Sequence, residues 1–155
     1  MRRSRTPRER FLRFLFVLYC AVMIWLLFFR SPGWVAGRSY EAQLRANINL
    51  VPFYTIGNYL QVILHRTNDD VLAHCFINLI GNVVLFIPAG VLVPKIWSKQ
   101  RNFFRFFFSC IGIMFLVEVL QLFTLLGSFD VDDLILNLLG MTVGFIGFHL
   151  FRKRS

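Results

Sequence analysis

The sequence predicts an all-α membrane protein, a polytopic bundle of about four transmembrane helices, from its composition and the placement of its charges. Hydrophobic residues make up 57% of the 155 residues and charged residues only 16%. A soluble domain of this size has too little interior to bury so much apolar surface. The apolar residues also gather in runs of membrane-spanning length, with basic clusters at their ends. We therefore expect residues 1–155 to form a single membrane domain.

The first predicted span covers residues 11–29 and follows a basic tail at residues 1–10. Arg13, near the start of this span, is long enough to reach the membrane interface with its guanidinium group. An arginine-rich segment before an apolar run is also typical of a secretory signal peptide. This run is long, however, and no small-residue cleavage site follows it, so we interpret it as an uncleaved anchor.

The longest connection, residues 30–70, contains turn residues near its start and a short apolar piece at residues 53–64. A helix of this length is too short to cross the hydrocarbon core of a bilayer. We interpret it as an interfacial or re-entrant segment in the first outer loop, lying on the bundle.

Three further spans are predicted at residues 71–94, 103–126 and 132–151. Thirteen of the 17 basic residues lie at the N-terminus (residues 1–13), in the connection at residues 95–105 and in the C-terminal tail. Four spans place these three clusters on the same side, and basic residues of short loops stay in the cytoplasm. We therefore expect a multi-pass protein with both termini in the cytoplasm. Because the basic clusters flank apolar runs, the net charge of +9 indicates membrane orientation and no nucleic-acid partner.

The last three spans carry polar side chains three or four residues apart, which places them on one face of each helix. They are His74, Asn78 and Asn82 in the second span, Glu118 and Gln121 in the third, and Asp133 and Asn137 in the fourth. A rise of about 1.5 Å per residue puts Asn82 near the midplane and the others toward the outer side, below an acidic mouth that includes Asp130 and Asp132. An ionised group at the bilayer centre costs roughly 2.5–3.5 kcal/mol, so such groups are paired or functional. We therefore expect a cavity that is open to the outside.

Each of these residues also has a purely structural interpretation. The aspartates at residues 130–133 stand where the fourth helix starts, and aspartate caps the free N–H groups of a helix start. The amide side chains in the spans could join helices by hydrogen bonds worth about 0.6 kcal/mol each. Glu118 differs, because the interiors of the spans contain no Lys or Arg to pair with it. This favours a functional role for Glu118.

Two further features of the spans bear on helix packing. Pro88 has no N–H group, so the second span should bend there. Gly140 and Gly144 are four residues apart in the fourth span, and this spacing allows another helix to approach closely.

The polar residues belong to an ordered set of short motifs that resembles the VanZ-like family, over about residues 45–147. The motifs are Asn49-Leu50-Val51-Pro52-Phe53, Asn78…Gly81-Asn82…Pro88-Ala89-Gly90…Pro94, Glu118-Val119-Leu120-Gln121, and Asp130-Val131-Asp132-Asp133…Asn137…Gly140…Gly144. Arg45, just outside the spans, also fits the family pattern. The family consists of small bacterial membrane proteins whose namesake is linked to teicoplanin resistance. The resemblance therefore implies the bacterial cytoplasmic membrane and a role in the cell envelope, and it implies no catalytic residues.

We rank first a binding function, in which the cavity recognises an amphiphile of the outer leaflet such as a lipid-linked envelope precursor or a lipoglycopeptide. Outer arginines, namely Arg30, Arg38, Arg45 and Arg66, could attract its phosphate. We expect membrane lipids as partners and no cofactor. The candidate ligand-binding residues are Asn78, Asn82, Glu118, Gln121, Asp130, Asp133, Asn137 and Arg45.

Two alternatives remain open. The first is a metal-dependent membrane enzyme acting on lipid-linked phosphates, in which the carboxylates of Asp130, Asp132, Asp133 and Glu118 would hold Mg²⁺ or Mn²⁺. Against it, helical rise puts Glu118 about 8 Å deeper than these aspartates, too far for one ion to join them. His74 is the only candidate imidazole base. The second alternative is purely structural, with the polar layer specifying how the helices pack.

Overall fold

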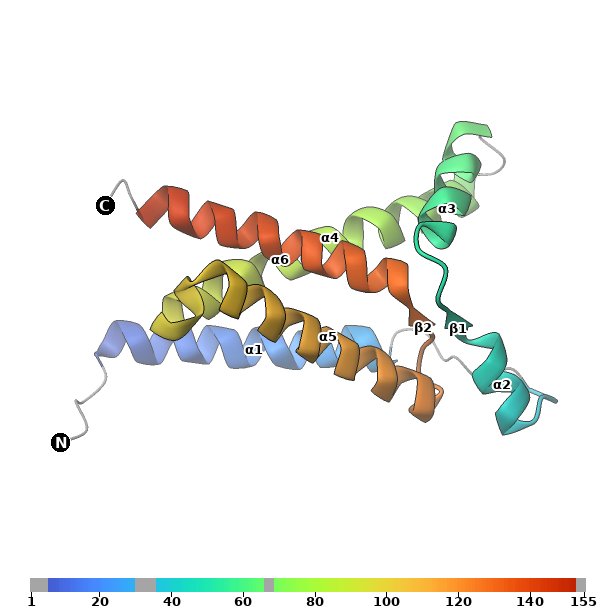
Figure 1. The fold of residues 1–155 in the computed structure, drawn as a ribbon, viewed down its shortest axis with the longest axis horizontal. Helices are drawn as coiled ribbons and strands as arrows, with labels where there is room; N and C mark the ends of the chain where they lie inside the picture. The colour runs from blue at the N-terminus through green and yellow to red at the C-terminus, as the bar shows by residue number, and fades with distance from the viewer. Residues whose placement is uncertain (1–5, 30–35, 66–68, 153–155) are drawn as a thin grey trace.

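Four long helices run lengthwise through the molecule, and the computed structural model describes residues 6–29, 36–65 and 69–152 of the chain (Figure 1). The four are long and apolar enough to cross a membrane, which confirms the predicted all-α bundle. They are α1 (Pro7–Phe29), α4 (Asp69–Ile96), α5 (Phe103–Thr124) and α6 (Val131–Arg152).

Shorter elements occupy the connections between the long helices. Three of them belong to the connection between α1 and α4: α2 (Tyr40–Ala46), β1 (Ile48–Asn49) and α3 (Tyr54–His65). The 3₁₀ helix η1 (Ser98–Arg101) joins α4 to α5, and β2 (Phe129–Asp130) joins α5 to α6. The segment expected to be interfacial or re-entrant is α3, a short helix that contacts α4 and α6. Its depth in a membrane stays a prediction.

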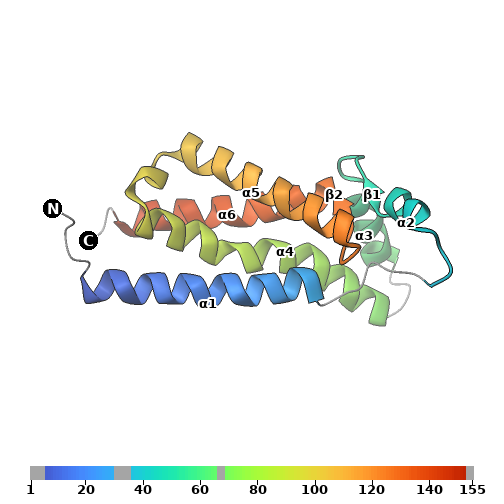
Figure 2. The same ribbon diagram turned by 90° about the horizontal axis from the view of Figure 1, so that it is seen from below.

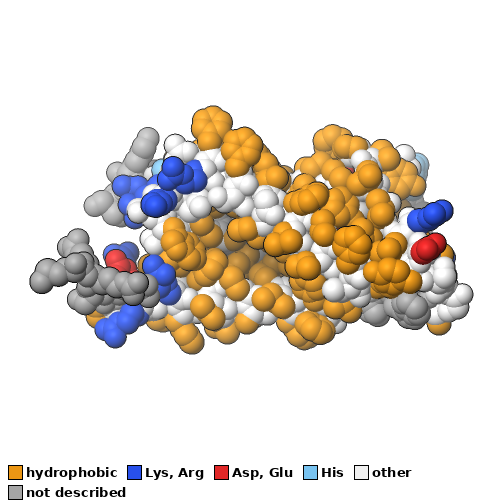
Figure 3. Space-filling model, turned by 60° about the horizontal axis from the view of Figure 1, so that its bottom comes forward, with side chains coloured by type: hydrophobic (Ala, Val, Ile, Leu, Met, Phe, Trp, Pro, Cys, Tyr) orange, Lys and Arg blue, Asp and Glu red, His pale blue; other side chains and the backbone are white. Residues whose placement is uncertain are grey.

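The two ends of the bundle differ in composition. The first and last described residues and η1 lie at one end, and α2, α3 and β1 lie at the other (Figure 2). We call the first the basic end, because Lys and Arg side chains gather there while the middle of the surface is apolar (Figure 3). Its described basic residues are Arg8, Arg10, Arg13, Lys95, Lys99, Arg101, Arg105 and Arg152. The opposite end is the α3 end.

The apolar core lies in the half of the bundle nearer the basic end. Phe106 and Phe145 stack there with ring centroids 4.7 Å apart. Residues from all four long helices complete this core: Met23, Phe86, Ala89, Phe106, Cys110, Met114, Met141 and Phe145. The polar side chains of α4, α5 and α6 therefore fall in the other half, toward the α3 end.

The closest helix contact joins α4 and α6 through glycines. A Cβ atom on Gly140 would lie 2.0 Å from the Val83 carbonyl oxygen, and one on Gly144 would lie 2.1 Å from that of Ile87. Gly90 of α4 is equally tight against the Met141 carbonyl oxygen, at 2.1 Å. The close approach predicted from Gly140 and Gly144 is confirmed. Pro88, where a bend of the second span was predicted, lies inside α4. The helix continues beyond Pro88 to Ile96.

A two-stranded parallel pairing of β1 with β2 was not expected from the sequence. Ile48 pairs with Phe129, and Asn49 pairs with Asp130. The Phe129 N–H donates to the Asn47 carbonyl oxygen at 2.8 Å. This pairing fixes the connection between α1 and α4 to the turn between α5 and α6, and so brings the helix α3 over this end of the bundle.

Candidate functional site

A cavity of about 250 Å³ lies at the α3 end, where residues from α1, α3, α4, α5 and the start of α6 meet. One part of its lining is apolar and comes from Leu26, Leu27 and Leu126. The rest is mostly polar and comes from Thr55, Tyr59, His74, Asn78, Gln121, Ser128, Asp130 and Asp133. We call this space the polar cavity. Four of the eight residues predicted to bind ligand line it, namely Asn78, Gln121, Asp130 and Asp133.

Asp130 ties three segments together at the wall of the polar cavity. Its Oδ2 accepts a hydrogen bond from the Thr55 hydroxyl at 2.7 Å, and its Oδ1 accepts from the Asn49 side-chain amide at 3.2 Å. Oδ1 also accepts from the Asp132 N–H at 2.8 Å, as an N-cap of α6 does. The predicted capping role of Asp130 is therefore confirmed, and its carboxylate also anchors β1 and α3.

Asp132 caps a different helix from the one it was expected to cap. Its side chain is 0% exposed, with Oδ1 accepting from the Phe53 N–H at 2.5 Å and Oδ2 from the Ile56 N–H at 3.0 Å. These two N–H groups belong to the start of α3, so the expectation that Asp132 caps its own helix is wrong. The pairing of β1 with β2 explains the difference, because it places the start of α3 directly beside the start of α6.

The polar residues of α4 face α3 and α6. The Asn78 side-chain amide donates to the Tyr59 hydroxyl at 3.3 Å and lies 3.2 Å from Nδ1 of His74. One turn deeper, the Asn82 amide donates to Oδ1 of Asp133 at 2.6 Å. Burial raises the pKa of Tyr59 above its ordinary value, which already lies well above neutral pH. The hydroxyl is therefore protonated and can donate into the polar cavity.

The two polar residues of α5 contact neighbouring segments. Oε2 of the buried Glu118 accepts from the Asp130 N–H at 3.2 Å. The Glu118 side chain thus reaches the backbone of Asp130, while the expected separation of about 8 Å in depth between Glu118 and the aspartates stays a prediction. Gln121 donates through Nε2 to the Leu27 carbonyl oxygen at 2.7 Å and so holds the end of α1 at the polar cavity.

The other predicted residues do not line the polar cavity. Asn82 and Glu118 instead form hydrogen bonds to Asp133 and Asp130, which do line the cavity. Asn137 is 2% exposed, and its Oδ1 has no hydrogen-bond partner within the described part of the chain. Arg45 is exposed on α2. Two other arginines expected to attract phosphate, Arg30 and Arg66, lie outside the described residues.

Several residues that line the polar cavity were not predicted from the sequence. Thr55 and Tyr59 lie on α3, which was treated as one apolar piece, and Ser128 lies in a loop. Thr55 is six residues after Asn49, and Tyr59 is four residues after Thr55. Neither spacing links these residues to the polar faces of the spans. The hydrogen bond from Asn49 to the Thr55 hydroxyl, at 2.9 Å, arises only because the chain turns between β1 and α3.

The acidic residues do not form a shared ligand set. Within residues 6–29, 36–65 and 69–152, no three His, Cys, Asp or Glu side chains meet in an arrangement that could hold a metal ion. The carboxylates of Asp130 and Asp132 instead accept hydrogen bonds from hydroxyl, amide and backbone N–H groups. The metal-dependent alternative gains no support from this geometry.

The comparisons with known proteins agree with the resemblance drawn from the motifs. The family model described as VanZ/LLP1 matches residues 16–152. The chain is 27% identical to Protein VanZ of Enterococcus faecium over 139 residues, which are 90% of this chain and 72% of that protein. No solved structure matches the chain.

Proposed function

The chain belongs to the VanZ/LLP1 family, and from this premise we propose that it is a cell-envelope membrane protein whose polar cavity binds an amphiphile. The amphiphile is an envelope lipid, such as a lipid-linked precursor, or a lipoglycopeptide. One observation carries the proposal: three leucines and a group of hydroxyl, amide and carboxylate side chains line the same cavity. Such a lining suits a molecule with an apolar chain and a polar head group.

The polar side chains divide into two roles in this proposal. Asn78, Gln121 and Asp133 line the polar cavity and contact the head group. Asn82 and Glu118 position the wall, because Asn82 holds the Asp133 carboxylate and Glu118 holds the Asp130 backbone. The cavity volume of about 250 Å³ accommodates part of a head group, with the acyl chain extending past Leu26 and Leu27 into the bilayer.

Binding is tested with the purified full chain in mild detergent, using teicoplanin and a polyprenyl-diphosphate-linked sugar as separate probes. Asn78→Ala is expected to weaken binding of at least one probe about five- to tenfold, because it removes a hydrogen-bonding group worth about 1 kcal/mol from the lining. Asp133→Asn removes a carboxylate from the same wall and should also weaken binding. Asn58→Ala is the matched control, since Asn58 is exposed on α3 and is not part of the lining. Unchanged affinity for both probes in both cavity variants would remove the polar cavity from the binding function.

We also infer that the α3 end faces outward from the bacterial cytoplasmic membrane. The basic end holds the described basic residues of the three clusters, and such residues stay in the cytoplasm. Ser128 lies at the α3 end and Ser98 in η1 at the basic end, and both are exposed. A membrane-impermeant thiol reagent is therefore expected to label Ser128→Cys in intact cells and to label Ser98→Cys only after permeabilisation. The reverse pattern would invert the topology.

A further inference from the structure

A second hollow, of about 320 Å³, lies at the basic end between the start of α5 and the end of α6. The exposed side chains of Phe103, Ile146 and Leu150 form its walls, and Phe145 and His149 lie beneath them. The lining is almost entirely apolar. It shares no residue with the polar cavity and lies at the opposite end of the bundle, so we call it the apolar groove.

Arginines stand where the apolar groove reaches the end of the bundle. Phe145, His149 and Arg152 are four and three residues apart on α6, so Arg152 continues the same helix face one turn further out. On the α5 side, the Arg101 carbonyl oxygen lies 3.2 Å from Nε2 of His149. Arg101 uses Nε to donate to the Pro94 carbonyl oxygen at 3.2 Å. The Arg101 side chain therefore turns toward the end of α4, and its backbone lies beside His149.

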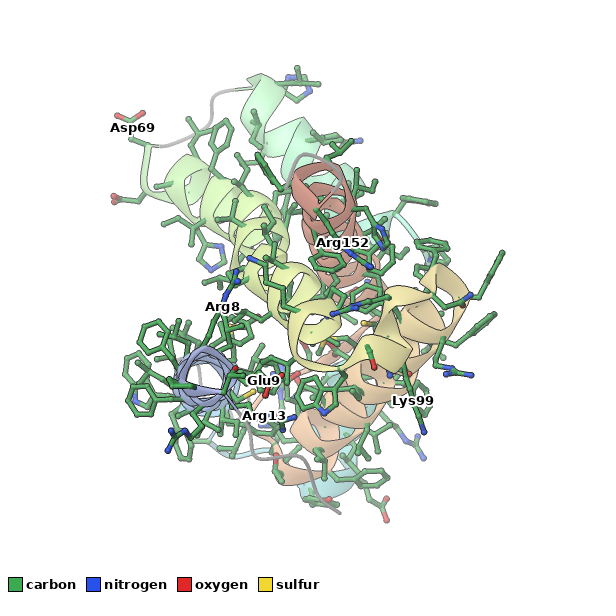
Figure 4. All side chains as sticks on the ribbon, turned by 90° about the vertical axis from the view of Figure 1, so that its left-hand side faces the viewer. Arg8, Glu9, Arg13, Asp69, Lys99 and Arg152 are labelled. Carbon is green, nitrogen blue, oxygen red and sulfur yellow. The ribbon has the colours of Figure 1, made fainter. Side chains whose placement is uncertain are left out.

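The basic end carries an excess of positive charge, which favours an anionic ligand. Eight basic residues are described there, and Glu9 on α1 is the only acidic residue described at this end. Figure 4 views the bundle from this end and shows Arg152 on α6 well separated from Glu9. The other acidic residues belong to the α3 half of the molecule.

We propose that the apolar groove binds one anionic phospholipid from the leaflet at the basic end. One acyl chain lies along Phe103, Ile146 and Leu150, and the phosphate sits beside the guanidinium group of Arg152. An apolar groove alone accepts the chain of any lipid, whereas charge complementarity at its mouth selects an anionic head group. The site is separate from the polar cavity, and it does not depend on the function proposed for that cavity.

The test measures retention of phosphatidylglycerol and phosphatidylcholine with identical acyl chains by the purified full chain, using native mass spectrometry over a lipid titration. The wild type is expected to retain one phosphatidylglycerol in preference to phosphatidylcholine. Arg152→Gln should weaken phosphatidylglycerol binding about fivefold, the effect of one basic residue near an anionic lipid. Ile146→Trp should weaken binding of the same lipid by filling the groove.

Two matched controls separate this site from general effects. Arg8→Gln removes the same charge at the same end, but from α1, which Figure 4 shows apart from α6. Leu139→Trp places the same bulk on α6 seven residues before Ile146, and the two parent side chains are 50% and 52% exposed. Both controls should retain phosphatidylglycerol as the wild type does. Equal retention of the two lipids by the wild type, or equal losses in a control and its partner variant, would overturn the proposal.

Discussion

Replacing Gly144 by alanine is expected to lower the stability of the bundle by about 3 kcal/mol, the upper part of the range for overpacking a tight interface. The added Cβ would lie 2.1 Å from the Ile87 carbonyl oxygen and 3.0 Å from the Cα of Gly90. Both are backbone atoms of α4, so no side-chain rotation relieves the clash and the two helices must separate. Thermal unfolding in mild detergent, followed by fluorescence, measures the change.

Gly147→Ala is the matched control on the same helix. A Cβ at Gly147 meets nothing within 4 Å. Alanine also has the higher helix propensity, by roughly 0.5–1 kcal/mol. The two Gly-to-Ala changes are therefore expected to move the melting temperature in opposite directions. A Gly144→Ala variant as stable as the wild type would show that α4 and α6 do not pack through these glycines.

The bounds of the spans could be predicted from the sequence, whereas the choice of which helices pack against each other could not. The predicted span at residues 71–94 is α4 (Asp69–Ile96), and the span at 132–151 is α6 (Val131–Arg152). Length and hydropathy set these bounds, because a bilayer demands a continuous apolar helix of fixed length. The predicted end of the third span at residue 126 was two residues too late. Leu125 adopts a left-handed conformation with φ of 53° and ends α5 within an apolar run, so hydropathy gives no signal there.

Helical spacing also predicted that polar side chains of α4, α5 and α6 would share one half of the bundle. It did not identify their partners. The contact between Phe53 and Asp132 joins residues 79 apart in the sequence, and the pairing of Asn49 with Asp130 depends on strands of two residues each. Neither feature has a local periodicity. The hydrogen bond from the Asp130 N–H to Glu118 was not predicted for the same reason, since helical rise alone does not describe how the turn after α5 folds.

The contact made by Asp132 supports the second prediction: Asp132→Ala is expected to detach α3 from the bundle and to cost about 3 kcal/mol. The substitution leaves the N–H groups of Phe53 and Ile56 without their acceptors. A hydrogen bond to a charged group contributes about 1.5–3 kcal/mol, and α3 also loses its cap. Asp132→Asn should cost less, because the amide oxygen still accepts one of the two hydrogen bonds.

A native cysteine reports whether α3 has left its place. Cys75 on α4 is 2% exposed and follows His74, whose ring lies against that of Tyr59 of α3 with centroids 6.4 Å apart. In a background with Cys20→Ala and Cys110→Ala, the Asp132→Ala variant is therefore expected to react with a water-soluble maleimide much faster than its parent. Asp69→Ala is the matched control, because Asp69 is exposed in the first turn of α4 and supports only that turn. If Cys75 stays as protected in Asp132→Ala as in Asp69→Ala, the cap does not hold α3 over the polar cavity. In that case the contacts of Asp130 with Thr55 and of Asn78 with Tyr59 are enough to hold this wall.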